Sequence, residues 1–262
     1  MNVKSSFLSY NWSDSANPTL DKHSPSTIMI KLYQFAPAFG LPNISSFCLK
    51  LETYLRMVKI PFESVYGSDM SKAPKGKMPY IIDGDKKIGD SNFIIDYLKQ
   101  TYGDLDAHLS ASDRAISLAM RRLIEENLYW VMAHNRWSEP KNWEMTKAVS
   151  FKELPALLKA TVPNLARKDM QKQIQGQGMG KHSSEEIYAI GIADLVALAD
   201  FLGDQQFFFG DEPTSLDASA YGILANILGT PFDSPLKDKA QQLSNIVAYC
   251  DRIRDRYYLT TR

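Results

Sequence analysis

Asp90 and Ser91 place a carboxylate and a hydroxyl directly before the segment 92–98, whose apolar residues recur at helical spacing. The N-terminus of a helix has N–H groups without partners in the helix and carries a partial positive charge. Such an end suits an anionic group, and a carboxylate in particular. The pair therefore predicts a position at which a small ligand with a carboxylate can bind.

Just upstream of this pair, the sequence predicts a β-hairpin. The apolar run 80–82 and Ile88 flank the turn 83–85, whose residues are typical of such turns. Pro79 stands directly before the first strand, a position where proline is tolerated. The Met78–Pro79 peptide bond can be cis there, because an X-Pro bond favours the trans isomer by only about 0.5–1 kcal/mol.

The elements that must position these residues begin with an apolar strand at 28–35. A helix is predicted at about 45–58 and, after Pro61, an alternating strand at 62–66. A strand, a helix and a second strand in this order form a right-handed βαβ unit by default. With the hairpin and the helix after it, the predicted order is β-α-β-loop-β-β-α, ending near Gly103.

After Gly103 the pattern predicts only helices, over about 112–134, 153–175, 184–202, 214–228 and 236–258. Capping-box patterns open two of them, at 183–186 and at 214–217. The helix at 214–228 is apolar on nearly every side. We therefore expect it to be the buried axis of an all-helical domain.

This arrangement, α/β followed by all-α, resembles the glutathione S-transferase superfamily. The resemblance divides the chain into a thioredoxin-like, glutathione-binding N-terminal domain at 28–103 and an all-helical glutathione-transferase C-terminal domain at 110–262. Residues 1–27 are rich in Ser, Asn, Asp and Pro and contain no apolar block of the kind that a signal peptide has. They are expected to form a disordered N-terminal extension.

The resemblance implies roles for the residues around the hairpin. In that family the proline, here Pro79, is cis, and the backbone of the preceding residue, here Met78, binds the cysteinyl unit of glutathione. Asp90 and Ser91 would bind the γ-glutamyl end, and Lys77 would meet the glycyl carboxylate. The alternative is a structural hairpin with solvated lysines. Glutathione is thus the expected co-substrate, and no metal is expected.

The group that activates the glutathione thiol is expected at the start of the first helix, where 45–48 reads Ser-Ser-Phe-Cys. Glutaredoxin-like proteins have a Cys-Pro-Phe-Cys type sequence there, and Ser45 takes the position of the reactive cysteine. A hydroxyl at a helix N-terminus can stabilise a thiolate, although Ser45 could equally be only the helix N-cap. Tyr33 is the second candidate, because some transferase classes use a tyrosine in that region; packing into the core is its alternative role. Cys48 is expected to be buried and inert, which argues against dithiol chemistry.

The second substrate of such transferases binds beside the helical domain. The densest aromatic and cationic cluster of the chain lies in 129–137, where Trp130 and Trp137 fall seven residues apart on one helix face. We expect a pocket for a small electrophile there, with core packing as the alternative. The candidate pocket residues are Phe39, Tyr129, Trp130 and Trp137.

The loop 36–43 is several residues longer than in the commonest transferases and resembles bacterial relatives of the failed-axon-connections and metaxin group. The agreement continues through 48–55, 73–77, 125–130, 180–183 and 210–213. Some members of this branch are thought to act in membrane-protein sorting. The expected function is a glutathione transferase that conjugates glutathione to a small electrophile or uses it in thiol exchange. The alternative is a non-catalytic, metaxin-like binding or assembly module; a glutathione-dependent reductase would need a nucleophilic cysteine.

Composition excludes several other classes of protein. The chain has 262 residues, of which 44% are apolar, enough for two ordinary domains. Thirty basic and thirty acidic residues cancel, so charge gives no reason to expect nucleic acid. Two cysteines and four scattered histidines do not form a disulfide framework or a zinc site, and no apolar run reaches the roughly 20 residues of a membrane span. We expect a cytoplasmic detoxification enzyme and, from the resemblance, a homodimer.

Overall fold

The computed structural model describes residues 29–259, and the extension expected at 1–27 lies outside them. Four strands form one sheet in the order β2-β1-β3-β4. β1 is parallel to β2 and antiparallel to β3, and β3 is antiparallel to β4, which confirms the predicted hairpin. The strands are β1 (Ile30–Gln34), β2 (Phe62–Tyr66), β3 (Tyr80–Asp83) and β4 (Lys86–Gly89).

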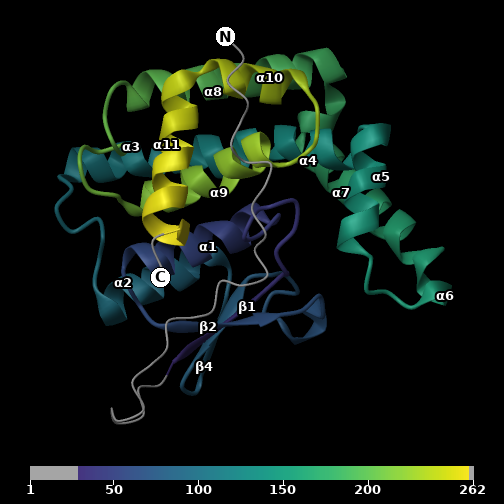
Figure 1. Ribbon diagram of the computed structural model, residues 1–262, viewed down its shortest axis with the longest axis horizontal. Helices are drawn as coiled ribbons and strands as arrows, with labels where there is room; N and C mark the ends of the chain where they lie inside the picture. The colour runs from purple at the N-terminus through teal and green to yellow at the C-terminus, as the bar shows by residue number, and fades with distance from the viewer. Residues whose placement is uncertain (1–28, 260–262) are drawn as a thin grey trace.

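The two faces of the sheet have different neighbours. Ile30, Leu32 and Gln34 are buried, and Gln34 donates a 2.7 Å hydrogen bond to Glu52 of helix α1 (Ser46–Met57). Because successive side chains of a strand point to opposite faces, Tyr33 faces away from α1. Helices α1 and α2 (Ser91–Tyr102) lie between the sheet and the central helix α9 (Ser215–Gly229) (Figure 1).

The second half of the described chain consists of helices and short helical turns. They are α3 (Ala111–Arg122), the π-helical turn η4 (Leu123–Leu128), α4 (Tyr129–Trp137), α5 (Pro140–Ser150), α6 (Ala156–Lys159), α7 (Val162–Gln177), α8 (Ser184–Leu202), α9 (Ser215–Gly229), α10 (Pro235–Gln242) and α11 (Ser244–Arg254). Two further short turns of this half are η5 (Met179–Lys181) and η6 (Asp255–Leu259), whereas η3 (Met70–Lys72) lies between β2 and β3. Within residues 29–259, no helix combines the length and the apolar character that crossing a membrane requires.

Two of the predicted helices are divided in the structure. The prediction of one helix over 153–175 is wrong, because Pro155 precedes the short α6 and Pro163 lies in the first turn of α7. Proline lacks an N–H donor and disfavours helical backbone in the residue before it. The prediction of one helix over 236–258 is wrong as well, because the chain leaves helical geometry at Leu243. There Asn245 donates hydrogen bonds to carbonyl groups at the end of α8, 2.9 and 3.1 Å long.

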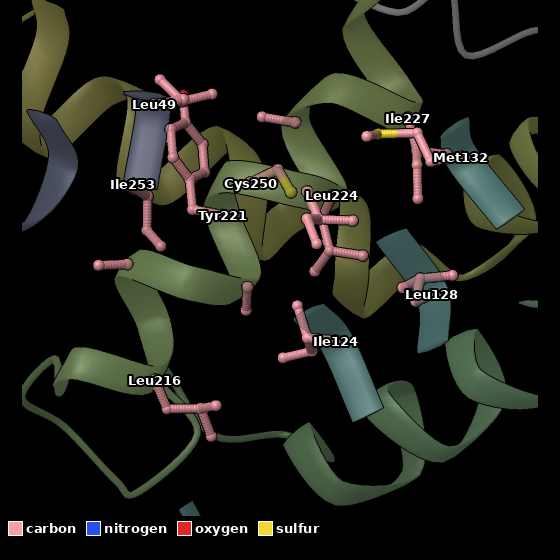
Figure 2. Close-up of a cluster of buried hydrophobic side chains, with 14 of the residues drawn as sticks. Leu49, Ile124, Leu128, Met132, Leu216, Tyr221, Leu224, Ile227, Cys250 and Ile253 are labelled. Atoms are coloured by element: carbon pink, nitrogen blue, oxygen red, sulfur yellow. The ribbon is translucent and has the colours of Figure 1, made fainter. Parts of the chain in front are cut away.

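Helix α9 is the axis of the molecule, as its apolar sequence predicts. Asp217 is fully buried at its first turn, where its carboxylate accepts hydrogen bonds from the backbone and hydroxyl of Thr214, 2.7 and 2.8 Å long. One continuous core surrounds α9 and includes side chains from the sheet, from α1 and from the later helices. Figure 2 shows part of it, with Leu49, Ile124, Leu128, Met132, Cys250 and Ile253 packed around α9.

Helices α1 and α9 approach closely because a glycine lies between them. A Cβ atom at Gly222 would stand 2.5 Å from the carbonyl oxygen of Ser46 and 3.1 Å from Lys50. The missing side chain therefore permits near backbone contact between the element that follows β1 and the central helix of the second half.

Candidate functional site

One edge of the sheet gathers the segments that the sequence singled out. Tyr80, the first residue of β3, pairs with Tyr33 near the end of β1 and with Gly89 at the end of β4. The residues just before β3, at 78–79, and just after β4, at 90–91, therefore lie side by side at this edge. The loop that leaves β1 for α1 starts from the same edge.

The hairpin residues have distinct environments at this edge. The Met78–Pro79 peptide bond is cis, as the resemblance implies. Pro79 is buried and Met78 is half-buried. Lys77 is exposed, and the Lys75 ammonium stands 4.0 Å from the centre of the Phe93 ring.

Asp90 is the N-cap of α2 and adopts an unusual backbone conformation. Its carboxylate accepts a 2.9 Å hydrogen bond from the Asn92 N–H and is exposed to solvent. Its φ angle is +78°, which is sparsely populated by residues other than glycine and costs roughly 1–3 kcal/mol. Ser91, the next residue, is buried. The surrounding fold thus holds an acid and a hydroxyl at the helix start in one fixed conformation.

A buried ion pair holds the start of α2 through Asn92, the second residue of that helix. Lys50 of α1 donates to Glu125 of η4 over 2.6 Å and to Asn92 over 2.7 Å, and Asn92 donates to Glu125 over 3.0 Å. Burial acts to raise the pKa of Glu125, but the charge and the hydrogen bond of Lys50 outweigh it and hold this pKa below its usual value. Arg121 also donates to Asn92, and the network borders a polar cavity of about 220 Å³ between α2, α3 and α9.

Sequence reasoning missed this network. Lys50 falls on the face of the predicted helix 45–58 that otherwise carries apolar residues, and a charged residue in that position was the available signal. Glu125 gave no comparable signal, because its partner lies 75 residues away along the chain.

Ser45 is the N-cap of α1. Its hydroxyl accepts a hydrogen bond from the Cys48 N–H at 3.5 Å, and its own N–H donates to Asn43 at 2.9 Å. Ser45 is half-buried. Cys48 is buried, as expected, and burial raises the pKa of its thiol to about 12 despite opposing hydrogen bonds from Ser45 and the Phe35 backbone. It is protonated near neutral pH, and a buried, protonated thiol is a poor nucleophile.

Tyr33 packs as an aromatic side chain. Its ring stacks on Tyr80, with 4.3 Å between the ring centres and 9° between the planes. Both rings belong to the sheet face that points away from α1. The structure thus assigns Tyr33 to a packing contact on the opposite face of the sheet from α1, whose start carries Ser45.

The four candidates for the second-substrate pocket make four ring contacts in three separate groups. Tyr129 packs against Phe47, in the first turn of α1, with 4.9 Å between ring centres, and against Trp130 with 5.2 Å. Trp137 packs on the buried Trp143 of α5, and Phe39 packs edge-on against Phe232. Tyr129 is the candidate that the structure brings against the first turn of α1, and Trp130 packs on Tyr129.

The segment before α1 is held by polar contacts that the sequence did not indicate. Asn43, fully buried, donates to the Phe35 carbonyl over 2.6 Å. Asn226 of α9 donates to the Asn43 carbonyl over 3.2 Å, and Arg136 of α4 donates to the Ile44 carbonyl over 2.5 Å. In the described part of the chain, no group of three or more His, Cys, Asp and Glu side chains is arranged to hold a metal ion.

Comparison with protein families gives two matches. The family model of the glutathione S-transferase N-terminal domain matches residues 46–142, and that of the glutathione S-transferase C-terminal domain matches residues 191–253.

Among individual relatives, the isoprene-epoxide–glutathione S-transferase of Rhodococcus sp. (strain AD45) is 39% identical over 87% of this chain and 99% of its own length. Failed axon connections of Drosophila melanogaster is 33% identical over 88% of this chain and 58% of its own length. Metaxin-1 of Mus musculus is 31% identical over 87% of this chain and 75% of its own length.

Solved structures share the fold at low sequence identity. The β-etherase of Sphingobium sp. strain SYK-6 is 16% identical, with a TM-score of 0.56 over 86% of this chain and 95% of its own. A glutathione S-transferase of Methylobacterium radiotolerans, solved with glutathione sulfonate, is 16% identical, with a TM-score of 0.54 over 87% and 91%. The sheet with α1 and α2 is a thioredoxin-like domain, and an all-helical domain follows it. The chain belongs to the glutathione S-transferase family.

Proposed function

We propose that this protein is a glutathione transferase, which binds glutathione and activates its thiol for conjugation to, or exchange with, a small electrophile. The observation that carries the proposal is the gathering of three segments at one sheet edge: 78–79, 90–91 and the start of the loop to α1. They offer, next to one another, the backbone around a cis peptide bond and a helix N-terminus with an acid and a hydroxyl. Asn43, which bonds both Phe35 and Ser45, ties the N-terminus of α1 to the same loop.

In this proposal each end of glutathione has a partner of suitable chemistry. The Ser91 hydroxyl and the N-terminus of α2 bind the γ-glutamyl carboxylate, and the exposed Asp90 carboxylate accepts hydrogen bonds from the ammonium group of the same unit. The backbone of Met78 binds the cysteinyl unit, and Lys77 meets the glycyl carboxylate. Ser45 donates a hydrogen bond to the thiolate at the start of α1.

The electrophile would bind against Tyr129, which packs on Phe47 in the first turn of α1, and against Trp130, which packs on Tyr129. An epoxide is the class to assay first, because the isoprene-epoxide–glutathione S-transferase is similar along nearly its whole length. A thiolate opens an epoxide by forming a carbon–sulfur bond while the carbon–oxygen bond breaks, and the oxygen then takes up a proton. A cytoplasmic homodimer belongs to the same proposal, and light scattering of the purified protein measures the number of chains.

Glutathione binding provides the direct test. Isothermal calorimetry of the wild-type protein is expected to show saturable binding at millimolar or lower glutathione, and Ser91→Ala is expected to weaken it by about 1–3 kcal/mol, the cost of leaving a charged group without its hydrogen bond. Ser110→Ala is the matched control, because Ser110 caps α3 through Asp113 and has no part in the proposed site. Its affinity for glutathione should equal that of the wild type. Absence of binding by the wild type would rule out the proposal.

A non-catalytic binding or assembly module is the second candidate. Its support is the likeness to metaxin-1 and to Failed axon connections, which extends over the same part of this chain as the likeness to the transferase. Turnover assays across epoxides and other electrophiles distinguish the two functions. Glutathione binding without turnover of any electrophile favours the module.

A further inference from the structure

Arg136 carries a positive charge inside the protein and donates a hydrogen bond to the carbonyl of Ile44, the residue before Ser45. Arg136 is 7% exposed, and among residues 29–259 no carboxylate forms an ion pair with it. Burial lowers the pKa of its guanidinium to about 10, so the group still carries its charge at neutral pH. Besides oxygen acceptors, the guanidinium contacts the ring of Phe232, with 5.3 Å from Cζ to the ring centre. A buried cation that lacks a counter-ion favours an anion brought close to it, because the anion offsets the cost of its burial.

The hydrogen bonds of Arg136 lead to residues 43–45, which directly precede α1. One terminal nitrogen donates to the Ile44 carbonyl over 2.5 Å, and the other donates to the side-chain oxygen of Asn226 over 3.0 Å. Its Nε atom is buried and has no hydrogen-bond partner. Asn226 in turn donates to the Asn43 carbonyl, and Asn43 accepts the N–H of Ser45. Three consecutive residues, 43–45, are thus fixed by a chain of contacts that starts at Arg136.

Four other charged or titratable groups near residues 43–45 do not neutralise the charge of Arg136. Glu52 of α1 is paired with Arg56 over 2.9 Å. Asp233, in the loop beyond α9, is exposed and pairs with Lys141. Tyr129 of α4 lies close enough to interact electrostatically with Arg136. Burial raises the pKa of its phenol, so Tyr129 is neutral. Cys48 of α1 is neutral for the same reason.

We propose that Arg136 is a positioning residue of the glutathione site: it fixes residues 43–45 and, through its unpaired charge, stabilises the negative charge on the sulfur of bound glutathione. This inference rests on the proposed function. At an effective dielectric of about 20, a positive charge roughly 10 Å from a thiolate already lowers the thiol pKa by about one unit. The same charge does little for a ligand that has no ionisable thiol.

The test compares glutathione with S-methylglutathione, which has the same carboxylates and ammonium but no thiol. For each variant, the pKa of bound glutathione is measured from the ultraviolet absorption of the thiolate, and affinities for both ligands are measured by calorimetry. Arg136→Met is expected to raise the bound thiol pKa by roughly one unit, while its affinity for S-methylglutathione changes by no more than about threefold. Arg136→Lys retains the charge and should restore most of the shift.

Arg167→Met is the matched control. Arg167 also donates to two carbonyl oxygens, those of Trp137 and Ser138 over 2.8 and 2.9 Å, and stands over the Trp143 ring, but it does not contact 43–45. Its substitution should leave the bound thiol pKa unchanged.

A second variant tests the charge if Arg136→Met does not fold. Asn226→Asp keeps an oxygen acceptor for Arg136, places a carboxylate next to the guanidinium and removes the amide donor to the Asn43 carbonyl, so it offsets the charge and loosens 43–45 together and should also raise the bound thiol pKa. An unchanged thiol pKa in a folded Arg136→Met or Asn226→Asp protein overturns the inference, as does an equal shift in Arg167→Met. If the wild type binds neither ligand, the proposed function fails instead, so the two failures are distinguishable.

Discussion

At the scale of single residues, the candidate site uses helix caps as its polar groups. Ser45 and Asp90 each cap a helix, and each lies at the sheet edge where the ligand is proposed to bind. Their positions could be predicted from sequence because a cap and its helix are neighbours in the chain. Lys50 and Arg136 could not, because their roles depend on Glu125 and Asn226, which lie 75 and 90 residues away.

Ser45 is expected to act on the thiol in addition to capping α1. Ser45→Ala should lower kcat/KM by roughly 5- to 150-fold, corresponding to the loss of one hydrogen bond of about 1–3 kcal/mol to a charged group. Affinity for S-methylglutathione should stay near the wild-type value, because that ligand has no thiolate. Steady-state rates and calorimetry measure the two quantities.

Ser46→Ala is the neighbouring control for this substitution. The Ser46 hydroxyl faces the sulfur of Met132 at 3.6 Å, away from the proposed thiol position. Its kcat/KM should change little. If Ser45→Ala and Ser46→Ala reduce the rate equally, the Ser45 hydroxyl has no specific role and serves as a cap alone.

At the scale of elements, the π-helical turn η4 directs two polar side chains to two different helices, α1 and α8. Glu125 pairs with Lys50 of α1, and Asn127 donates over 2.7 Å to Asp194 of α8. The apolar pattern predicted one helix over 112–134, and the structure has helical turns from 111 to 137 with the π turn at 123–128. A π turn adds one residue to a helical turn without a distinct sequence pattern, so its position could not be predicted.

Asp194, at the contact between η4 and α8, makes the stability of the folded protein depend on pH. Burial raises the pKa of Asp194 from 3.8 to about 6, against a smaller opposing effect of the hydrogen bond from Asn127. Because the folded-state pKa lies above the unfolded one, the folded state favours the protonated acid, and stability decreases as pH rises from 3.8 through about 6. Asp194→Asn removes this effect and retains an acceptor for Asn127.

Denaturant unfolding at several pH values provides the measurement. Above the folded-state pKa, Asp194→Asn is expected to be more stable than the wild type by up to about 2 kcal/mol. The difference should shrink as the pH falls through 6 and vanish below 3.8, where both side chains are neutral. A difference that does not vary with pH would show that Asp194 titrates normally.

At the scale of the whole molecule, the two domains share one core. The order of the strands and of most helices was predictable from sequence, because periodicity and capping act locally, whereas α5 and the divisions at Pro155 and at Leu243 were missed. The second of these depends on contacts between Asn245 and the end of α8, which no local pattern records. The close approach of α1 to α9 could not be predicted either, because it depends on the tertiary contact between Gly222 and Ser46.

Gly222→Ala is expected to destabilise the whole protein. Its Cβ would stand 2.5 Å from the Ser46 carbonyl oxygen, so the two helices must separate, at a cost of about 1–3 kcal/mol. Gly176→Ala, in α7, is the matched control, because a Cβ there meets no atom within 4 Å, and it should stabilise the protein by about 0.5–1 kcal/mol. Urea unfolding of both variants measures the difference. Equal stability of the two would show that the α1–α9 contact is easily relaxed.

The α1–α9 contact also limits which chimeras between relatives can fold. A crossover placed between α2 and α3 would join one parent's α1 to another parent's α9. Such a recombinant keeps the native interdomain geometry only if the donated α9 has a glycine opposite Ser46, because any larger residue collides with backbone that cannot rotate away. Exchange of the helical half between relatives therefore succeeds through matched pairs of α1 and α9, which makes those two helices the unit to transfer together when chimeras are constructed.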